Sequence, residues 1–176
     1  MPMEFNLEHA IAVLSQTPHT LMSMLENLPH EWIEKNEGPE TWSPYDIAGH
    51  LIHGEKTDWI PRMEIILSKS SNKKFEPFDR FAQFKDSQGK TLSQLLDEFE
   101  SLRKGNIAKL RAKNLKAADF SKTGIHPAFG DVTLAQLLST WVAHDLNHIA
   151  QIARVMAKQY KAEVGPWVEY LRILQS

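Results

Sequence analysis

Three capping boxes mark the beginnings of three long helices in this chain of 176 residues. In a capping box, the residue before the helix and a residue three positions later each bind the other's free backbone N–H group through their side chains. The pairs are Ser43 with Asp46, Thr91 with Gln94, and Thr133 with Gln136. Apolar residues recur at helical intervals after each pair, which predicts helices over residues 44–68, 91–113 and 133–159.

The first forty residues predict shorter helices before the first capping box. Residues 5–15 form an amphipathic pattern that Pro18 should stop or bend. Thr17 and Pro18 then suit the cap and the first position of a second helical run, from Leu21 to Leu28. Residues 29–41 are polar and contain two prolines and a glycine, so we expect a connection there.

Two residues should disturb the helix predicted over residues 44–68. Gly54 lies one turn beyond His50 and leaves space where a side chain would stand. Pro61 removes a backbone hydrogen bond, which should kink the helix near Thr57. The pattern predicts either a cavity beside His50 or close packing of another helix at Gly54.

Two long connections and a terminal segment complete the chain. Residues 69–90 carry several phenylalanines, which should either cover a pocket or fasten this segment to the helices. Residues 114–131 suggest an irregular crossover with a small hairpin. Residues 164–174 should pack Trp167, Tyr170 and Leu171 against one end of the bundle. The predicted fold class is all-α: a four-helix bundle with extra short helices at the N- and C-termini, in a single domain over residues 1–176.

Composition limits the kinds of function that this chain can have. A net charge of −2 gives no electrostatic reason to expect nucleic acid or an anionic membrane as a partner. The first residues lack a secretory pattern, and no apolar run reaches the length of a membrane span, so we expect the protein in the cytoplasm. Because the chain has no cysteine, any metal must be held by His, Asp or Glu.

Three histidines fall on the inner faces of the predicted helices. His144 and His148 lie one turn apart on an otherwise apolar stripe, close enough for both rings to reach one ion. His50 projects inward from the helix over 44–68. Three protein ligands and one open position are typical of a catalytic divalent metal site. The alternative is that the three are core histidines in a hydrogen-bond network.

Several polar residues near these histidines allow more than one role. His53 could be a second-sphere base or a fourth ligand, but a partly exposed position without a role is the favoured interpretation. Asp145 and Asn147 could orient imidazole groups or be solvated, and Gln151 could orient His148. Glu55 and Arg62 should be surface or interhelical ion-pair residues.

The remaining histidines have no partner at metal-ligand spacing. We expect them to be ordinary surface or packing residues: His9, His19, His30 and His126.

Two motifs resemble the DinB/YfiT-like superfamily of damage-inducible, metal-dependent proteins. They are the segments from Trp42 to Glu55 and from His144 to Gln151, with the Gly-Asp-Val-Thr-Leu sequence at 130–134 leading into the second helix. The resemblance covers nearly the whole chain. It implies a four-helix bundle, often a homodimer, in which His50, His144 and His148 bind a divalent metal.

The resemblance also implies a class of activity. The first hypothesis is a metal-dependent enzyme with a thiol-dependent S-transferase-like or hydrolase-like activity on an electrophilic small molecule, with a low-molecular-weight thiol as a second partner. Nickel or zinc is the expected metal, with iron and manganese as further candidates. The alternatives are a non-catalytic metal-binding stress-response module and a metal-free helical interaction domain. No residue is assigned as a general base.

Overall fold

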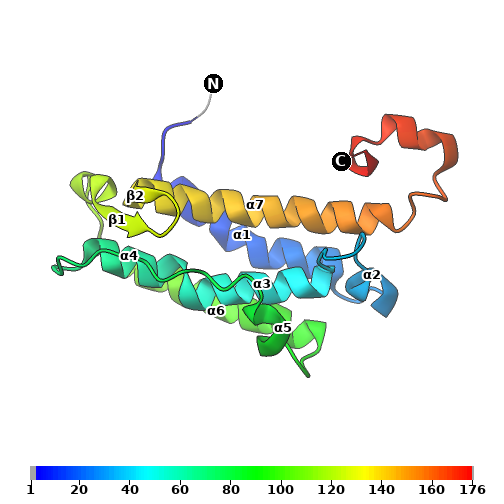
Figure 1. Cartoon of the computed structure of the whole chain (residues 1–176), viewed down its shortest axis with the longest axis horizontal. Coiled ribbons are helices and arrows are strands. Elements are labelled where there is room, and N and C mark those ends of the chain that lie inside the picture. Colours follow the sequence, from blue (N-terminus) through cyan, green and yellow to red (C-terminus); the bar gives the residue numbers. More distant parts are fainter. Residues whose placement is uncertain (1–2, 176) are drawn as a thin grey trace.

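Four long helical segments lie side by side in the computed structural model, which describes residues 3–175 (Figure 1). They are α1 (Leu7–Leu25), the consecutive helices α3 (Pro44–Thr57) and α4 (Trp59–Leu67), α6 (Leu92–Ala112), and α7 (Leu134–Lys158). Helix α1 packs against α6 and α7, and α3 packs against the same two helices. The predicted four-helix bundle is therefore confirmed.

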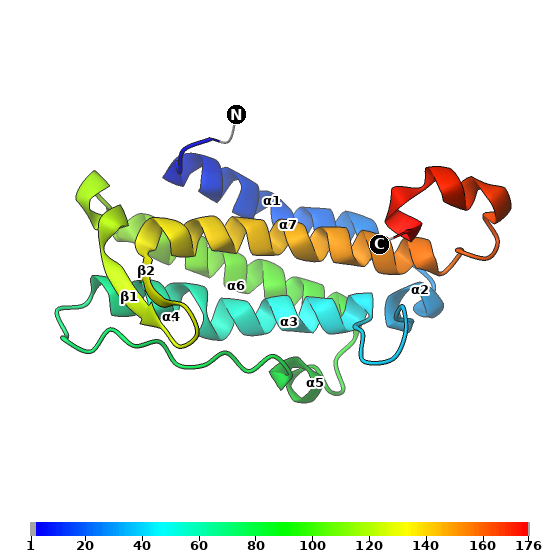
Figure 2. The ribbon, with the colours of Figure 1, turned by 45° about the horizontal axis from the view of Figure 1, so that its top comes forward.

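Short elements connect the long helices and flank the bundle. They are α2 (His30–Glu34), α5 (Ala82–Asp86), η1 (Ala117–Ser121), β1 (Thr123–His126), β2 (Gly130–Thr133), η2 (Gly165–Tyr170) and η3 (Arg172–Leu174). The two strands pair antiparallel, with Thr123 opposite Thr133, so the hairpin expected in the crossover is present. It lies against α4 and the beginning of α7 (Figure 2). Helix α2 is an addition to the segment that we expected to be only a connection.

All three capping boxes form where the sequence predicts them. At the first, the Ser43 hydroxyl accepts from the Asp46 backbone N–H at 3.2 Å, and the Asp46 carboxylate accepts from the Ser43 N–H at 2.9 Å. The equivalent reciprocal contacts cap α6 and α7. These signals are local in sequence, so they fix the helix starts without help from tertiary contacts.

The expected break at Pro18 is absent, because α1 continues through it as one of the four bundle helices. A proline at position 18 cannot donate to the carbonyl of Leu14, which would leave that buried oxygen unsatisfied. The Arg103 guanidinium donates to the Leu14 carbonyl at 2.7 Å instead. Thr17 is not a cap, since its hydroxyl donates to the Asp145 carboxylate at 2.6 Å. The helix is capped by Asn6.

The predicted kink is present between α3 and α4. The helices are separated at Asp58, whose backbone has φ of −108° and ψ of −68°. Pro61 lacks the N–H group that would otherwise bond to the carbonyl of Thr57, which explains the position of the bend. Helix α4, beyond the bend, contacts strand β1 of the hairpin.

A buried polar layer separates two apolar clusters along the bundle. One cluster contains Leu14, Trp59, Leu110 and Trp141, and the other contains Leu21, Ile52, Phe99 and Ile152. Between these positions, each bundle helix contributes one polar residue that is at most 2% exposed: Thr17, Glu55, Arg103 and Asp145. Buried charges of this kind must be paired, and the layer therefore depends on all four helices being in register.

The C-terminal segment packs differently from the prediction. Trp167 and Tyr170 are 68% and 83% exposed, and Leu171 is 39% exposed, whereas Leu174 is buried at 2%. The segment forms two 3₁₀ helices, and η3 lies against α7 (Figure 2). The prediction assumed an α-helix, whereas a 3₁₀ helix has three residues per turn. The residues predicted to face the bundle are therefore not the ones that are buried. Within residues 3–175, no helix is both long and apolar enough to cross a membrane.

Candidate metal centre

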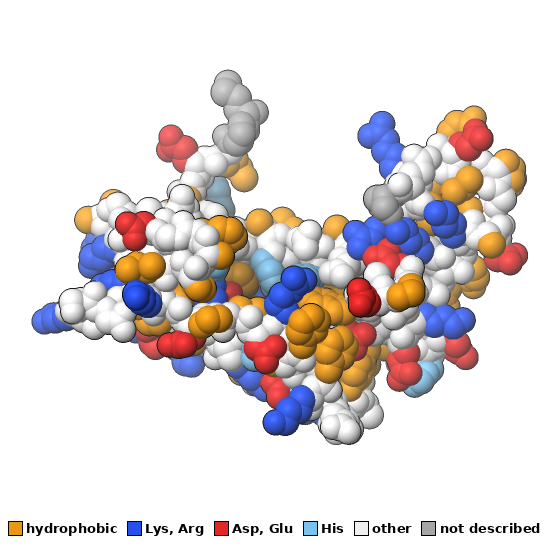
Figure 3. Space-filling view, in the orientation of Figure 1, with side chains coloured by type: hydrophobic (Ala, Val, Ile, Leu, Met, Phe, Trp, Pro, Cys, Tyr) orange, Lys and Arg blue, Asp and Glu red, His pale blue; other side chains and the backbone are white. Residues whose placement is uncertain are grey.

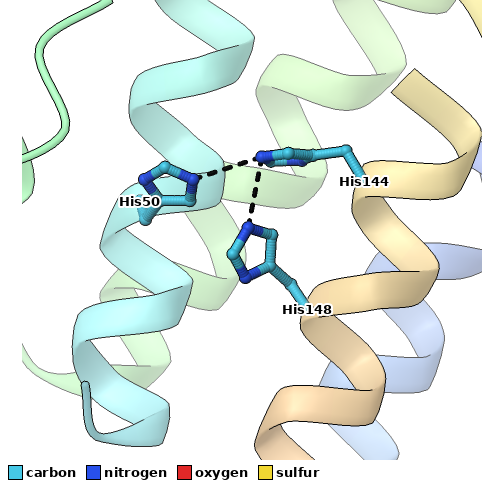
Figure 4. A group of neighbouring side chains, drawn as sticks. All are labelled: His50, His144 and His148. Atoms are coloured by element: carbon cyan, nitrogen blue, oxygen red, sulfur yellow. Dashed lines mark hydrogen bonds between the residues drawn. The ribbon is translucent and has the colours of Figure 1, made fainter. Parts of the chain in front are cut away.

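The three predicted histidines meet between α3 and α7. His50 projects from α3, and His144 and His148 project from successive turns of α7, so that their rings point toward one another (Figure 4). The Nε2 atom of His144 lies 3.2 Å from Nε2 of His50 and 3.2 Å from Nε2 of His148. The three nitrogens lie within 4.8 Å of one another, and in residues 3–175 these three side chains form the group of potential metal ligands.

The donor set fits a divalent transition metal. Nδ1 of His148 lies 2.7 Å from the amide oxygen of Gln151, so this nitrogen carries the proton and Nε2 presents its lone pair. The N–N separation of 3.2 Å is close to the value of about 3.3 Å that follows from tetrahedral coordination with metal–N bonds of about 2.0–2.1 Å. Three converging lone pairs repel one another unless a cation or proton lies between them.

The electrostatic environment keeps the imidazoles neutral. Burial, followed by the positive charge of neighbouring histidines, lowers the pKa of His50 and of His144 to about 3. Burial also lowers the pKa of His148, although Gln151 opposes that shift. A neutral imidazole is the form that binds a metal, so the ligands need not lose protons near pH 7.

Aromatic rings hold the histidine rings in place. Trp42 lies 4.7 Å from the centroid of His50, and Phe78 meets the same ring edge-on at 5.4 Å. Trp59 meets the ring of His144 edge-on at 5.1 Å. These contacts restrict rotation of the imidazole rings, as a preorganised site requires.

The histidines line a cavity of about 1370 Å³. Its walls come from α3, α4, α5, α7, the hairpin, and the segments between α2 and α3 and between α4 and α5. Figure 3 shows the hollow with histidine side chains visible inside it. Gly54 lies on the wall, and a Cβ atom there would come within 3.3 Å of the Trp59 indole nitrogen. The cavity expected beside His50 is therefore present, and the close neighbour of Gly54 is a side chain five residues later in the same predicted helical segment. The volume exceeds the 300–1,000 Å³ that is typical of small-molecule sites.

The phenylalanines of residues 69–90 divide between the two predicted roles. Phe75 is buried, at 4% exposure, and fastens the segment to the core. Phe78 covers His50. Phe81 and Phe84 lie on the cavity wall and stay 63% and 50% exposed.

Two of the neighbouring polar residues can be placed directly. Gln151 contacts His148, as predicted. His53 is buried at 9% exposure rather than partly exposed, because Phe78 lies 5.0 Å from its ring. The Nδ1 atom of His53 lies 3.6 Å from an Asp86 carboxylate oxygen. His53 does not belong to the converging group of His50, His144 and His148.

The charged neighbours form ion pairs. Asp145 neither orients an imidazole nor is solvated; it is fully buried and accepts from Arg103 at 2.6 and 3.1 Å. Glu55 forms the predicted interhelical ion pair, with Arg103 at 2.8 Å. Arg62 is buried and pairs with Asp58.

The sequence interpretation missed Arg103. A signal was present, because Phe99, Arg103, Asn106 and Leu110 fall on one helical stripe, and a charge inside an apolar stripe indicates a buried partner.

Asn147 is exposed on the cavity wall. His9, His19 and His30 are outside the site, whereas His126 lines the cavity with its ring stacked on Phe129 at 4.5 Å. None of the four joins the converging group within residues 3–175.

Known proteins share both the sequence and the fold. A presumed metal-dependent hydrolase of Bacillus licheniformis is 29% identical over 154 residues, which cover 85% of this chain and 84% of that protein. YfiT from Bacillus subtilis is described as a probable metal-dependent hydrolase with an unusual four-helix bundle topology. Its structure superimposes on this chain with a TM-score of 0.74 at 23% sequence identity, and the match covers 90% of this chain and 92% of YfiT. The four-helix bundle protein TT2238 superimposes with a TM-score of 0.53 at 16% identity, over 84% and 98% of the two chains.

The family model of the DinB superfamily matches residues 14–152. This range is more than half of the chain and includes the three converging histidines. The chain therefore belongs to the DinB superfamily.

Proposed function

We propose that this protein is a metal-dependent enzyme in which His50, His144 and His148 hold a divalent transition metal. The observation that carries the proposal is the convergence of three neutral imidazole nitrogens beside a large cavity. The B. licheniformis relative, a presumed metal-dependent hydrolase, and YfiT of B. subtilis, described as a probable one, support the same proposal. Nickel and zinc suit an all-imidazole donor set, with iron and manganese as alternatives.

The protein's own residues prepare the site for this chemistry. Gln151 accepts the His148 Nδ1 proton and so directs the Nε2 lone pair toward the ion position. Trp42 and Phe78 fix the orientation of His50. Three uncharged ligands leave a divalent cation with its full charge, and when bound it would lower the pKa of a coordinated water or thiol.

The cavity is compatible with two types of reaction. An electrophilic small molecule would bind against its aromatic wall and react with water, in a hydrolysis, or with a low-molecular-weight thiol, in a transfer reaction. Hydrolysis is supported by the names of the relatives. Transfer is supported by the volume of about 1370 Å³, which accommodates two small molecules at once.

Metal content is the direct test of the centre. Protein purified without an affinity tag should contain about one transition-metal ion per chain by elemental analysis, because three donors at this spacing bind tightly. The His148→Ala variant should lose the metal. His126→Ala removes another histidine of the same cavity and should retain it. A wild-type protein that stays metal-free after incubation with zinc or nickel would contradict the proposal.

Turnover separates the enzyme from its alternatives. Metal-loaded protein would be incubated with activated esters and alkyl halides, with and without a thiol, and the products identified by mass spectrometry. Products that contain the thiol indicate transfer, and products of water attack indicate hydrolysis. Tight metal binding without turnover across the panel would favour a non-catalytic metal-binding module.

A further inference from the structure

Three arginines line the cavity, and carboxylates neutralise two of them. The Arg62 guanidinium pairs with Asp58. The Arg154 guanidinium donates three hydrogen bonds to the Glu37 carboxylate, at 3.2, 3.0 and 2.6 Å. Arg80 differs, because it has no ion pair or hydrogen bond with any residue between positions 3 and 175. It is a cation on the wall of the site whose charge the described protein leaves unpaired.

Arg80 lies on the same stretch of chain as a residue that contacts His50. Phe78, two residues earlier, places its ring 5.4 Å from the ring of His50. Asp79 does not neutralise Arg80, since its carboxylate accepts from the Phe81 backbone N–H at 2.9 Å. That hydrogen bond closes a turn just before α5, which anchors the backbone on both sides of Arg80.

Exposed aromatic rings also lie on the cavity wall. Phe81 and Phe84 follow Arg80, and their rings stack at 6.3 Å with an interplanar angle of 15°. Phe129 reaches the wall from the hairpin and is 79% exposed. Figure 3 shows hydrophobic and basic side chains together at the edge of the hollow. Large apolar groups that remain exposed around a cavity are typical of a ligand-binding surface.

We propose that the cavity binds an organic anion, with its acidic group on Arg80 and its apolar body on Phe81 and Phe84. The planar guanidinium offers paired N–H donors that match a carboxylate, sulfonate or phosphate. Glu40, the other charged wall residue without an ion pair among the described residues, lies between α2 and α3 and does not pair with Arg80. That this anion is the substrate rests on the proposed function. That the cavity binds such an anion does not depend on the proposed function.

A matched pair of fluorescent probes tests the proposal on metal-free protein. 8-Anilinonaphthalene-1-sulfonate carries a sulfonate, and N-phenyl-1-naphthylamine has the same rings without it. Arg80→Gln should weaken binding of the sulfonate about tenfold, the usual effect of losing a hydrogen bond to a charged group. Binding of the neutral probe should change less than about twofold, since its contacts are apolar.

Two further variants make the test specific. Arg80→Lys keeps the charge but loses the planar fork, so it should fall between wild type and Arg80→Gln. Lys85→Gln removes an exposed charge of the same segment that is not on the cavity wall, and both affinities should stay at the wild-type level. Circular dichroism would verify that each variant is folded.

Three results would overturn the proposal: equal affinity of wild type and Arg80→Gln for the sulfonate, equal loss for both probes, or no sulfonate binding by the wild type. Because no metal and no turnover enter this experiment, its failure is distinguishable from failure of the proposed function. A metal-free wild-type protein would refute the metal centre and leave the anion site standing.

Discussion

Replacing Arg103 by Met is expected to destabilise the protein more than any surface change of charge. Arg103 is 1% exposed and joins α6 to the three other bundle helices. Its guanidinium donates to the Leu14 carbonyl at 2.7 Å, to Glu55 at 2.8 Å, and to Asp145 at 2.6 and 3.1 Å. Methionine fills most of the same volume but supplies none of these donors.

The magnitude follows from what the substitution leaves behind. Glu55 and Asp145 remain buried, at 2% and 0% exposure, with no cation between them. Removing one partner of a buried ion pair costs about 3–5 kcal/mol, because the remaining charge is uncompensated. A domain of this kind is stabilised by about 5–15 kcal/mol in total. We therefore expect a folded but weakly stable variant that has lost about 3–5 kcal/mol.

Urea unfolding followed by circular dichroism, at pH 7 with a chelator present, measures this loss. Arg111→Met is the control, since Arg111 lies on the same helix in an exposed ion pair and should cost less than about 1 kcal/mol. The triple variant with Arg103→Met, Glu55→Gln and Asp145→Asn removes the unpaired charges and should recover part of the stability. A loss below about 1 kcal/mol for Arg103→Met, or no recovery in the triple variant, would refute the reasoning.

The loss should also depend on pH. Burial raises the pKa of Glu55, while the charge and hydrogen bonds of Arg103 oppose that shift. Without Arg103 the pKa in the folded protein rises further above that of the unfolded chain. Such a group stabilises the folded state at low pH, and this contribution is lost as the pH rises through the folded pKa. The cost of Arg103→Met should therefore be smaller at pH 5 than at pH 7, and a cost that grows on acidification would contradict this account.

Two further predictions concern local packing and charge. An added Cβ at Gly124 would overlap the ring of Phe75, so Gly124→Ala should lower the free energy of unfolding by about 1–3 kcal/mol. Gly105 lies on α6 with open space around it, so Gly105→Ala should raise the free energy of unfolding by about 0.5–1 kcal/mol. The midpoints of thermal unfolding of the two variants should therefore shift in opposite directions. Hydrogen bonding to Arg154 lowers the pKa of Glu37 from 4.5 to about 2, so its contribution to stability is present above pH 4.5 and is lost as the pH falls toward 2. The free energy of unfolding of Glu37→Gln should therefore fall less than that of the wild type between about pH 5 and pH 2. If the two proteins lose stability equally over this range, Glu37 does not make this contribution.

The sequence predicted the features of the fold that depend on neighbouring residues. Capping boxes at Ser43, Thr91 and Thr133 need only residues three positions apart, and the kink at Asp58 follows from Pro61 alone. Pro18 shows the limit of such rules. Whether a proline breaks a helix depends on what becomes of the carbonyl four residues before it, and Arg103 supplies that partner from 89 residues away in the sequence.

The candidate site divides in the same way. His144 and His148 could be paired from sequence because one helical turn brings them together, and His50 could be added because it falls on the inner face of the helix predicted over residues 44–68. The family resemblance implied the same three ligands. Arg80 could not be assigned, since its significance is the absence of a partner among the described residues, which only the folded chain reveals. The roles of Glu55 and Asp145 likewise depend on a residue of a third helix.

The polar layer lies next to the histidines along the bundle, which bears on the proposed metal site. Glu55 follows His50 by five residues on α3, and Asp145 follows His144 directly on α7. Arg103 binds both carboxylates, and it therefore links the two helices that carry the histidines. A shift of α7 along its axis would break these ion pairs and separate the Nε2 atoms together. Arg103→Met should then weaken metal binding as well as folding, whereas Arg111→Met should affect neither.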